Sequence, residues 1–326
     1  MKRDKDTQVR TCLSPGAIVA IIVRLGRVTP TIFAECLRIR DKVTILNVIA
    51  RLGYLTERHI EACTGITEGL SKLLQELCDT DHLIRVPVEG FPVVYWIRPR
   101  GLSEVEDFEI PGIGTISPAQ MGSSQRTTFC SCRVSDPMVM PHALAVADIA
   151  VAFYRAYSGV VLGERMLRLA EKLTGKQIGT ASITRSRRRC PDAVVIAPTG
   201  EVTAVEVECS PHADTEVISA AKAYIRADHI ARVIYIAHGK TVEQVVKRCL
   251  KTVEAGQKLV LVARNGKRLP RQQDIRPAGA RFRHRRPDQS RAQVVARGNA
   301  IHGARPHNSG PNRTSRRSVE REHVCS

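Results

Sequence analysis

One short stretch of the sequence carries the carboxylates of Asp192, Glu206 and Glu208 on its two apolar, Val-rich segments. The stretch 192–208 is rich in Val, Ile and Thr, and a Pro-Thr-Gly segment ending at Gly200 supplies turn chemistry in its middle. This pattern predicts a β-hairpin. Because side chains alternate along a strand, Glu206 and Glu208 share one face of the second strand.

The register of this hairpin decides whether Asp192 joins the two glutamates. A loop centred on Gly200, with an odd number of residues, places Asp192 opposite Glu208 and Val194 opposite Glu206. Glycine tolerates the positive φ that such a bulged turn needs. We therefore expect all three acids on one face, whereas an even loop would send Asp192 to the other face.

Three acids on one face repel each other unless a cation or a proton lies between them. Oxygen ligands from Asp192, Glu206 and Glu208 suit Mg²⁺ or Mn²⁺, which could align a phosphodiester and activate a water molecule. The alternative is a solvent-facing hairpin whose outer positions are acidic, because exposed strand faces are often charged.

A run of arginines directly precedes the hairpin. Its members are Arg185, Arg187, Arg188 and Arg189. Such a run is often only a solvated loop, but next to the acids it could hold a phosphate backbone beside a metal site.

Residues 41–101 predict three helices followed by a β-hairpin, the element order of a winged helix-turn-helix. Gly53 ends the first helix, Thr56 caps the second, Thr67 caps the third, and the hairpin turns at residues 89–90. The third helix has apolar residues at positions i, i+3, i+4 and i+7, namely Leu70, Leu73, Leu74 and Leu77.

The third of these helices exposes side chains that can bind DNA. Ser71, Lys72 and Gln75 could reach base edges or phosphates from a helix in the major groove. Residues 41–101 carry seven basic and eight acidic side chains, however, which is unusual for a stand-alone DNA reader. We therefore favour DNA binding by this segment with help from basic neighbours. The alternative is that it contacts other proteins or a second copy of the chain.

The pattern beyond this segment predicts an α/β domain. Helix, strand, hairpin, helix, strand, helix and strand follow one another around one mixed sheet, and residues 233–237 form a fully apolar strand. Residues 159–169 predict a strand entering a loop, with Glu164 near its end. His142 and Asp148 lie about 240° apart around their helix and cannot form one site on it.

These observations predict an α+β or α/β chain with five parts. We expect an N-terminal extension at 1–40, the winged helix-turn-helix at 41–101, a linker with one β-ribbon at 102–140, an αβ sandwich at 141–263 and a disordered basic tail at 264–326.

The net charge of +18 is concentrated in the tail. Residues 264–326 contain sixteen Arg and Lys and four Asp and Glu. Such an excess implies affinity for a polyanion, above all nucleic acid, through counterion release.

The cysteines and apolar runs indicate a cytoplasmic protein without a membrane partner. Ten cysteines are scattered without C-x-x-C spacing, so we expect reduced thiols rather than a zinc site. No signal-like segment opens the chain, and the longest apolar run, Ala17 to Val23, is too short to span a bilayer.

The order of helix, strand, Pro-Asp hairpin with Glu-x-Glu, and helix resembles the PD-(D/E)xK phosphodiesterase superfamily. The whole layout resembles the replication-relaxation proteins of actinobacterial plasmids and integrative elements, in which a winged helix precedes a nuclease-like domain. The resemblance covers roughly residues 42–263. Its matching pieces are residues 142–148, 163–168, 191–195 and 205–211.

The resemblance implies particular roles for the acids. It makes Asp192 and Glu206 metal ligands and Glu164 an additional acid from an earlier element. Active members usually carry a lysine at the position of Glu208, and some move it to the next helix, where Lys222 is the only candidate.

Three functions follow as hypotheses. The first is a DNA-binding protein of plasmid or mobile-element replication, relaxation or mobilisation that nicks DNA with Mg²⁺ or Mn²⁺. Its expected protein partners are a plasmid relaxase or replication proteins. The second is a non-enzymatic DNA-binding accessory protein or transcriptional regulator. The third is a protein-interaction scaffold.

Overall fold

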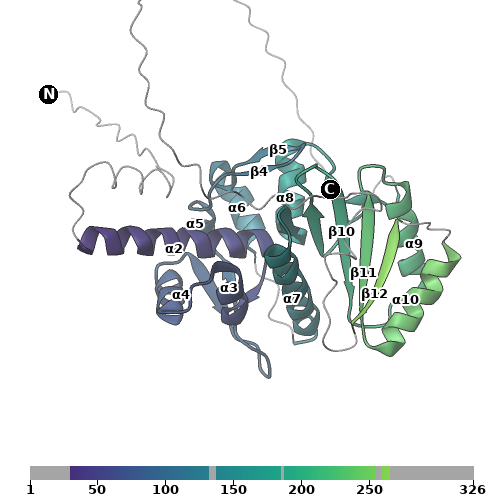
Figure 1. The fold of residues 1–326 in the computed structure, drawn as a ribbon, viewed down its shortest axis with the longest axis horizontal. Coiled ribbons are helices and arrows are strands. Elements are labelled where there is room, and N and C mark those ends of the chain that lie inside the picture. The colour runs from purple at the N-terminus through teal and green to yellow at the C-terminus, as the bar shows by residue number, and fades with distance from the viewer. Residues whose placement is uncertain (1–29, 132–136, 185–186, 254–257, 265–326) are drawn as a thin grey trace, which may run out of the picture. The chain divides into compact units, whose positions relative to one another are not determined.

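The computed structural model describes residues 30–131, 137–184, 187–253 and 258–264, and all of these belong to one compact unit. They form a mixed α+β structure in which helices surround several β-sheets (Figure 1). Arg185 and the expected tail from residue 265 onward lie outside the described residues.

The N-terminal part consists of helices followed by a small antiparallel sheet of strand order β1-β3-β2. Its elements are α2 (Pro30–Leu52), β1 (Leu55–Thr56), α3 (Glu57–Thr64), α4 (Leu70–Asp79), β2 (Leu83–Val86) and β3 (Val94–Ile97). Pro30 is the first residue of α2. Proline is well tolerated there, because the first helical residues have no intrahelical partner for their N–H groups. The expected boundary at residue 40 therefore falls inside α2.

The expected N-cap residue is the observed one at α3 but not at α4. The Thr56 side chain accepts a hydrogen bond from the His59 N–H at 3.3 Å, and Gly65 ends α3 with φ 72°. Thr67 was expected to cap α4, but Gly69 is the N-cap residue, with φ 71°. This left-handed conformation favours glycine and moves the helix start beyond Thr67. The four expected leucines of α4 are buried.

Residues 99–130, which include most of the linker expected at 102–140, contribute to the core. Their elements are α5 (Pro99–Leu102), β4 (Phe108–Ile110), β5 (Gly114–Ile116), the 3₁₀ helix η1 (Pro118–Gln120) and α6 (Ser123–Cys130). The expected β-ribbon is the β4–β5 pair. Phe108 and Phe129 are buried in the same apolar cluster as the leucines of α4, so this segment packs against both of its neighbours.

The C-terminal part is built on a mixed five-stranded sheet of order β12-β11-β10-β9-β6. Strands β10, β11 and β12 are parallel, whereas β6, β9 and β10 pair antiparallel. Its elements are α7 (Met140–Ala156), β6 (Val160–Gly163), α8 (Glu164–Thr174), β7 (Ala181–Ser182), β8 (Arg188–Arg189), β9 (Ala193–Ile196), β10 (Val202–Glu208), α9 (Asp214–Arg226), β11 (Arg232–His238), α10 (Lys240–Thr252) and β12 (Leu259–Arg264).

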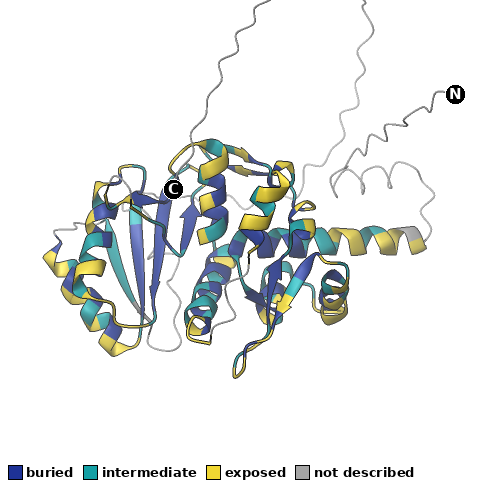
Figure 2. Cartoon of the chain, turned by 180° about the vertical axis from the view of Figure 1, so that it is seen from behind, coloured by how far each residue is buried: buried dark blue, intermediate teal, exposed yellow. Residues whose placement is uncertain are grey.

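Helices cover both faces of this sheet, so its central strands are buried on both sides (Figure 2). Ile234 and Ile236 pack with residues of α7 and α8, whereas Val233 and Tyr235 pack with residues of α9 and α10. This alternation along β11 follows from the two-residue period of a strand.

One expected loop is a helix. After β6 the chain was expected to enter a loop, but α8 begins at Glu164, and Met166, Leu167 and Ala170 on it are buried. Their spacing matches one face of a helix, which packs against β6 and β9. Among the described helices, none combines the length and the apolar character needed to cross a lipid bilayer.

Candidate functional site

The β9–β10 hairpin has the expected turn but a different register. Its loop, residues 197–201, has an odd number of residues, and Gly200 has φ 86°. The last observed pair is Ala193 with Val205, so the same register continued by one residue brings Asp192 opposite Glu206. The expected pairing of Asp192 with Glu208 was therefore wrong by two residues. A shift of two preserves the face of residues within the strands. Asp192 itself precedes β9, and it lines a pocket with residues of α2, α7 and α8, whereas Glu208 lines a pocket with residues of α9.

Asp192 completes the hydrogen bonding at the end of the β9–β10 ladder. Continued pairing would bring Pro191 opposite Val207, and proline has no N–H to donate. Instead, the Asp192 Oδ2 atom accepts from the Val207 N–H at 2.7 Å, and His142 Nε2 lies 3.0 Å from the Val207 carbonyl oxygen. Both side chains therefore hold the backbone of one residue of β10, Val207.

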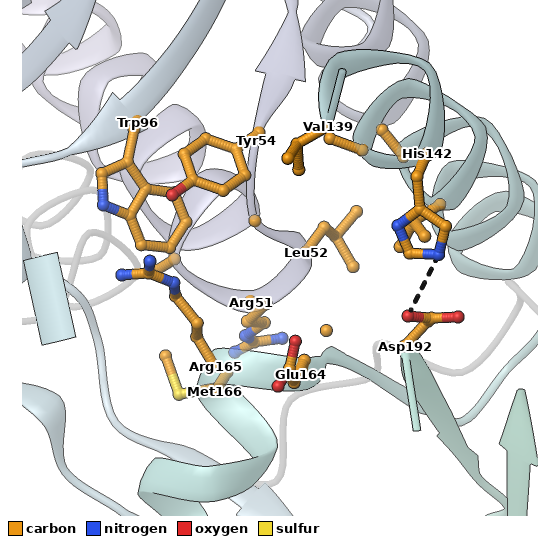
Figure 3. Close-up of a pocket in the computed structure, with 16 residues that line it drawn as sticks. Arg51, Leu52, Tyr54, Trp96, Val139, His142, Glu164, Arg165, Met166 and Asp192 are labelled. Carbon is orange, nitrogen blue, oxygen red and sulfur yellow. Dashed lines mark ion pairs between the residues drawn. The ribbon is translucent and has the colours of Figure 1, made fainter. Parts of the chain in front are cut away.

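His142 and Asp192 also interact directly. Their Nε2 and Oδ1 atoms lie 3.5 Å apart, and the two side chains point toward one another (Figure 3). The hydrogen bond to Asp192 raises the pKa of His142, although burial opposes this. The two residues lie far apart in the sequence, and His142 was not among the expected site residues.

Replacing Asp192 by asparagine is expected to lower the pKa of His142, because the charged hydrogen-bond partner that raises it is lost. The amide oxygen can still accept from Val207, so the strand end is retained. NMR titration of the imidazole would measure this change. In the wild type, the stability contribution of His142 is present at low pH and is lost as pH rises through its raised pKa. An unchanged His142 pKa in the variant would contradict this account.

Glu206 is the most deeply buried acid of the hairpin, with an exposed fraction of 0%. Arg189 donates to both of its oxygens, from Nε at 2.9 Å and from Nη2 at 2.7 Å, and the Tyr224 hydroxyl donates to it as well. Bidentate pairing of this kind matches the planar guanidinium fork to the carboxylate. One strand (β10), one short ribbon (β8) and one helix (α9) thus meet at Glu206.

Burial raises the pKa of Glu206 to about 7, because the loss of hydration outweighs the hydrogen bonds from Arg189 and Tyr224. The hydrogen bond to Glu206 in turn raises the pKa of Arg189, so the guanidinium stays charged. The Glu206 carboxyl therefore changes protonation near neutral pH.

Glu208 lies two residues further along the same face of β10 and has its own partner. His212 Nε2 is 3.0 Å from Glu208 Oε2, and burial raises the pKa of Glu208. Both residues line a pocket of 290 Å³, together with Arg187, Arg189 and the N-terminal part of α9.

The side chains of the three acids do not fit a divalent cation as they are arranged. Both Glu206 oxygens bind Arg189, Asp192 binds the Val207 N–H and faces His142, and Glu208 binds His212. Within residues 30–131, 137–184, 187–253 and 258–264, no group of three metal-binding side chains is found. The acids are neutralised by protein cations and hydrogen-bond donors.

Among the contacts of the described residues, neither of the other two residues implied by the resemblance is a partner of Glu206. Lys222 is exposed on α9 and lies two residues from Tyr224, about 200° around the helix, so it is directed away from the acids. Glu164 begins α8, where its carboxylate accepts from Arg168 at 2.8 Å. Its backbone N–H donates to the Asp192 carbonyl oxygen at 3.0 Å.

A second pocket, of 370 Å³, lies where α2, α7 and α8 meet the start of β9 (Figure 3). Glu164, Asp192 and His142 line one part of it, and Arg165 and Trp96 line another. No motif marked Arg165 beforehand, although it lies within the stretch 163–168 singled out from the sequence. His212 and Tyr224 were likewise missed.

The expected nucleic-acid contacts are only partly free. Ser71, Lys72 and Gln75 are exposed on α4, but Ser71 donates to Glu57 and Gln75 donates to Asp79 at 2.7 Å. Arg187 and Arg188 are exposed, whereas Arg189 is committed to Glu206.

Comparison with known proteins gave no relative. No family model matches the chain, and no curated protein or solved structure matches it either.

Proposed function

We propose that the chain is a DNA-binding protein of the replication-relaxation type, serving plasmid or mobile-element replication or mobilisation, and that it does not cleave DNA. In this proposal, residues 41–101 are a winged helix-turn-helix. Residues 141–263 are an αβ sandwich related to the PD-(D/E)xK nuclease fold. The order of three helices and a hairpin, and the mixed sheet between helices, support both assignments.

The observation that carries the non-cleaving assignment is the bidentate ion pair between Arg189 and Glu206. The guanidinium takes up both oxygens of the glutamate that the resemblance assigns to a catalytic metal. Without a metal, neither Lewis-acid activation of a water nor stabilisation of the departing oxygen is provided at this position. The domain then serves as a binding module.

Two features support DNA as the partner. Lys72 and the neighbouring polar side chains of α4 are exposed on the helix that precedes the hairpin, and the chain carries most of its +18 charge beyond residue 263. Phosphate contacts from basic residues supply affinity without sequence information.

Incubating supercoiled plasmid with Mn²⁺ tests the non-cleaving assignment. The wild-type protein is expected to produce no more nicked circles than Glu206→Ala or Asp192→Ala, while it shifts the same DNA in a gel. Manganese-dependent nicking by the wild type that both variants lose would establish a nuclease instead.

Salt dependence tests the binding assignment separately. Deleting residues 265–326 is expected to weaken DNA binding and to reduce the slope of log Kd against log salt, because each lost phosphate contact removes about 0.9 from that slope. Fluorescence anisotropy with a labelled duplex measures both quantities. If the wild-type protein binds no DNA even at low salt, DNA binding is refuted and the protein-interaction scaffold is the hypothesis that remains.

A further inference from the structure

A groove of 560 Å³ runs between α6 and α8, outside the acid hairpin. The α8 wall carries Arg165, Arg168 and Lys172, with Glu164 as its one carboxylate, and the α6 side contributes Gln125 and Thr128. The lining therefore has an excess of positive charge next to neutral polar groups. This surface was not among the sites expected from the sequence.

One of the three cations is held in a fixed position. Arg165 Nη1 donates to the Phe129 carbonyl oxygen at 2.8 Å and also to the Ser131 carbonyl oxygen. Its guanidinium carbon lies 5.1 Å from the centre of the Trp96 ring. Such contacts organise the charge before any ligand arrives, so less side-chain entropy is lost on binding.

The other two cations lie along the exposed side of α8. Arg168 and Lys172 are four residues apart, so they are stacked on one helix face about 6 Å apart along the axis. The ion pair of Arg168 with Glu164 is exposed, at 57% and 46% of the two side chains. Exposed pairs contribute about 0–1 kcal/mol, so a phosphate group can compete for Arg168.

We propose that this groove binds the phosphate backbone of a nucleic acid. Three cations in a row, with the Gln125 amide on the facing helix, match a chain of phosphodiesters more closely than a single small anion. The groove also shares Glu164 and Arg165 with the pocket of Figure 3, so a bound strand would lead toward Asp192. This inference rests on the proposed function and locates a DNA path on the αβ domain.

The test compares two pairs of substitutions in the full-length protein. Arg168→Gln with Lys172→Gln removes two charges from the groove. Lys247→Gln with Lys251→Gln removes two charges from exposed positions four residues apart on α10. Salt titrations of binding to a labelled duplex and to a labelled single strand are monitored by fluorescence anisotropy.

The groove pair is expected to lower the slope of log Kd against log salt by about 2 and to weaken binding roughly 30-fold at low salt. The α10 pair should change the slope by less than half as much. Arg168→Lys with Lys172→Arg keeps both charges and should bind like the wild type, which separates charge from folding. Equal effects of the groove and α10 pairs, or an unchanged slope for the groove pair, would overturn the inference. A wild-type protein that binds neither probe would refute the proposed function itself.

Discussion

Replacing Arg189 by methionine is expected to lower the free energy of unfolding by about 3 kcal/mol at about pH 8.5. The substitution leaves the Glu206 carboxylate buried without its guanidinium partner. The loss is placed at the lower end of the range for broken buried pairs, because the Arg189 side chain is 39% exposed and water can partly replace it. Urea unfolding monitored by circular dichroism measures this difference.

The same substitution is expected to cost much less at about pH 5, because a protonated Glu206 needs no cation. The pKa of Glu206 is raised to about 7 in the folded protein, above its ordinary value of 4.5. Its contribution to stability is therefore complete below pH 4.5 and is lost as pH rises through about 7. A loss of equal size at both pH values would contradict the assignment of this pKa to Glu206.

A double variant separates the charge from the packing. Arg189→Met combined with Glu206→Leu removes both charges and keeps apolar volume at the site, so it is expected to recover most of the lost stability at high pH. If the double variant is as unstable as Arg189→Met alone, packing of Arg189 rather than its charge is responsible.

Replacing Glu171 by alanine is expected to be about as costly, near 3 kcal/mol, for a different reason. One oxygen of Glu171 accepts from the backbone N–H groups of Ile178, Gly179 and Thr180, at 2.8, 3.0 and 3.0 Å. Its other oxygen accepts from the Thr180 hydroxyl at 2.8 Å. Removing the carboxylate leaves these donors unpaired in a buried loop, at about 1–3 kcal/mol for each group that water cannot reach.

Two further variants test this role of Glu171 by thermal and urea unfolding. Glu61→Ala removes an exposed acid from the helix α3 and is expected to change stability by less than about 0.5 kcal/mol. Glu171→Gln keeps one acceptor oxygen and is expected to lose only part of the stability. A Glu171→Ala protein as stable as Glu61→Ala would show that the loop does not depend on this side chain.

The local pattern of the sequence determined much of the fold around the hairpin. Alternation along β10 placed Glu206 and Glu208 on one face whatever the register, and Gly200 was identified as the residue with positive φ at the turn. The leucines of α4 and the apolar run of β11 were likewise recognisable, because their burial follows from helical and strand periods. Strand alternation, helical spacing and the turn glycine all depend on residues that are close together in the sequence, so they can be predicted without knowing the tertiary structure.

Only the tertiary structure decided what those acids contact. Glu206 meets Arg189 from the preceding ribbon and Tyr224 from α9, and Asp192 meets His142 from a helix 50 positions earlier in the chain. Periodicity fixes the face on which a side chain lies, but the partner is set by how distant elements pack. For the same reason, a sequence with three nearby carboxylates predicted a metal site, whereas the packed chain neutralises each carboxylate with its own side-chain partners.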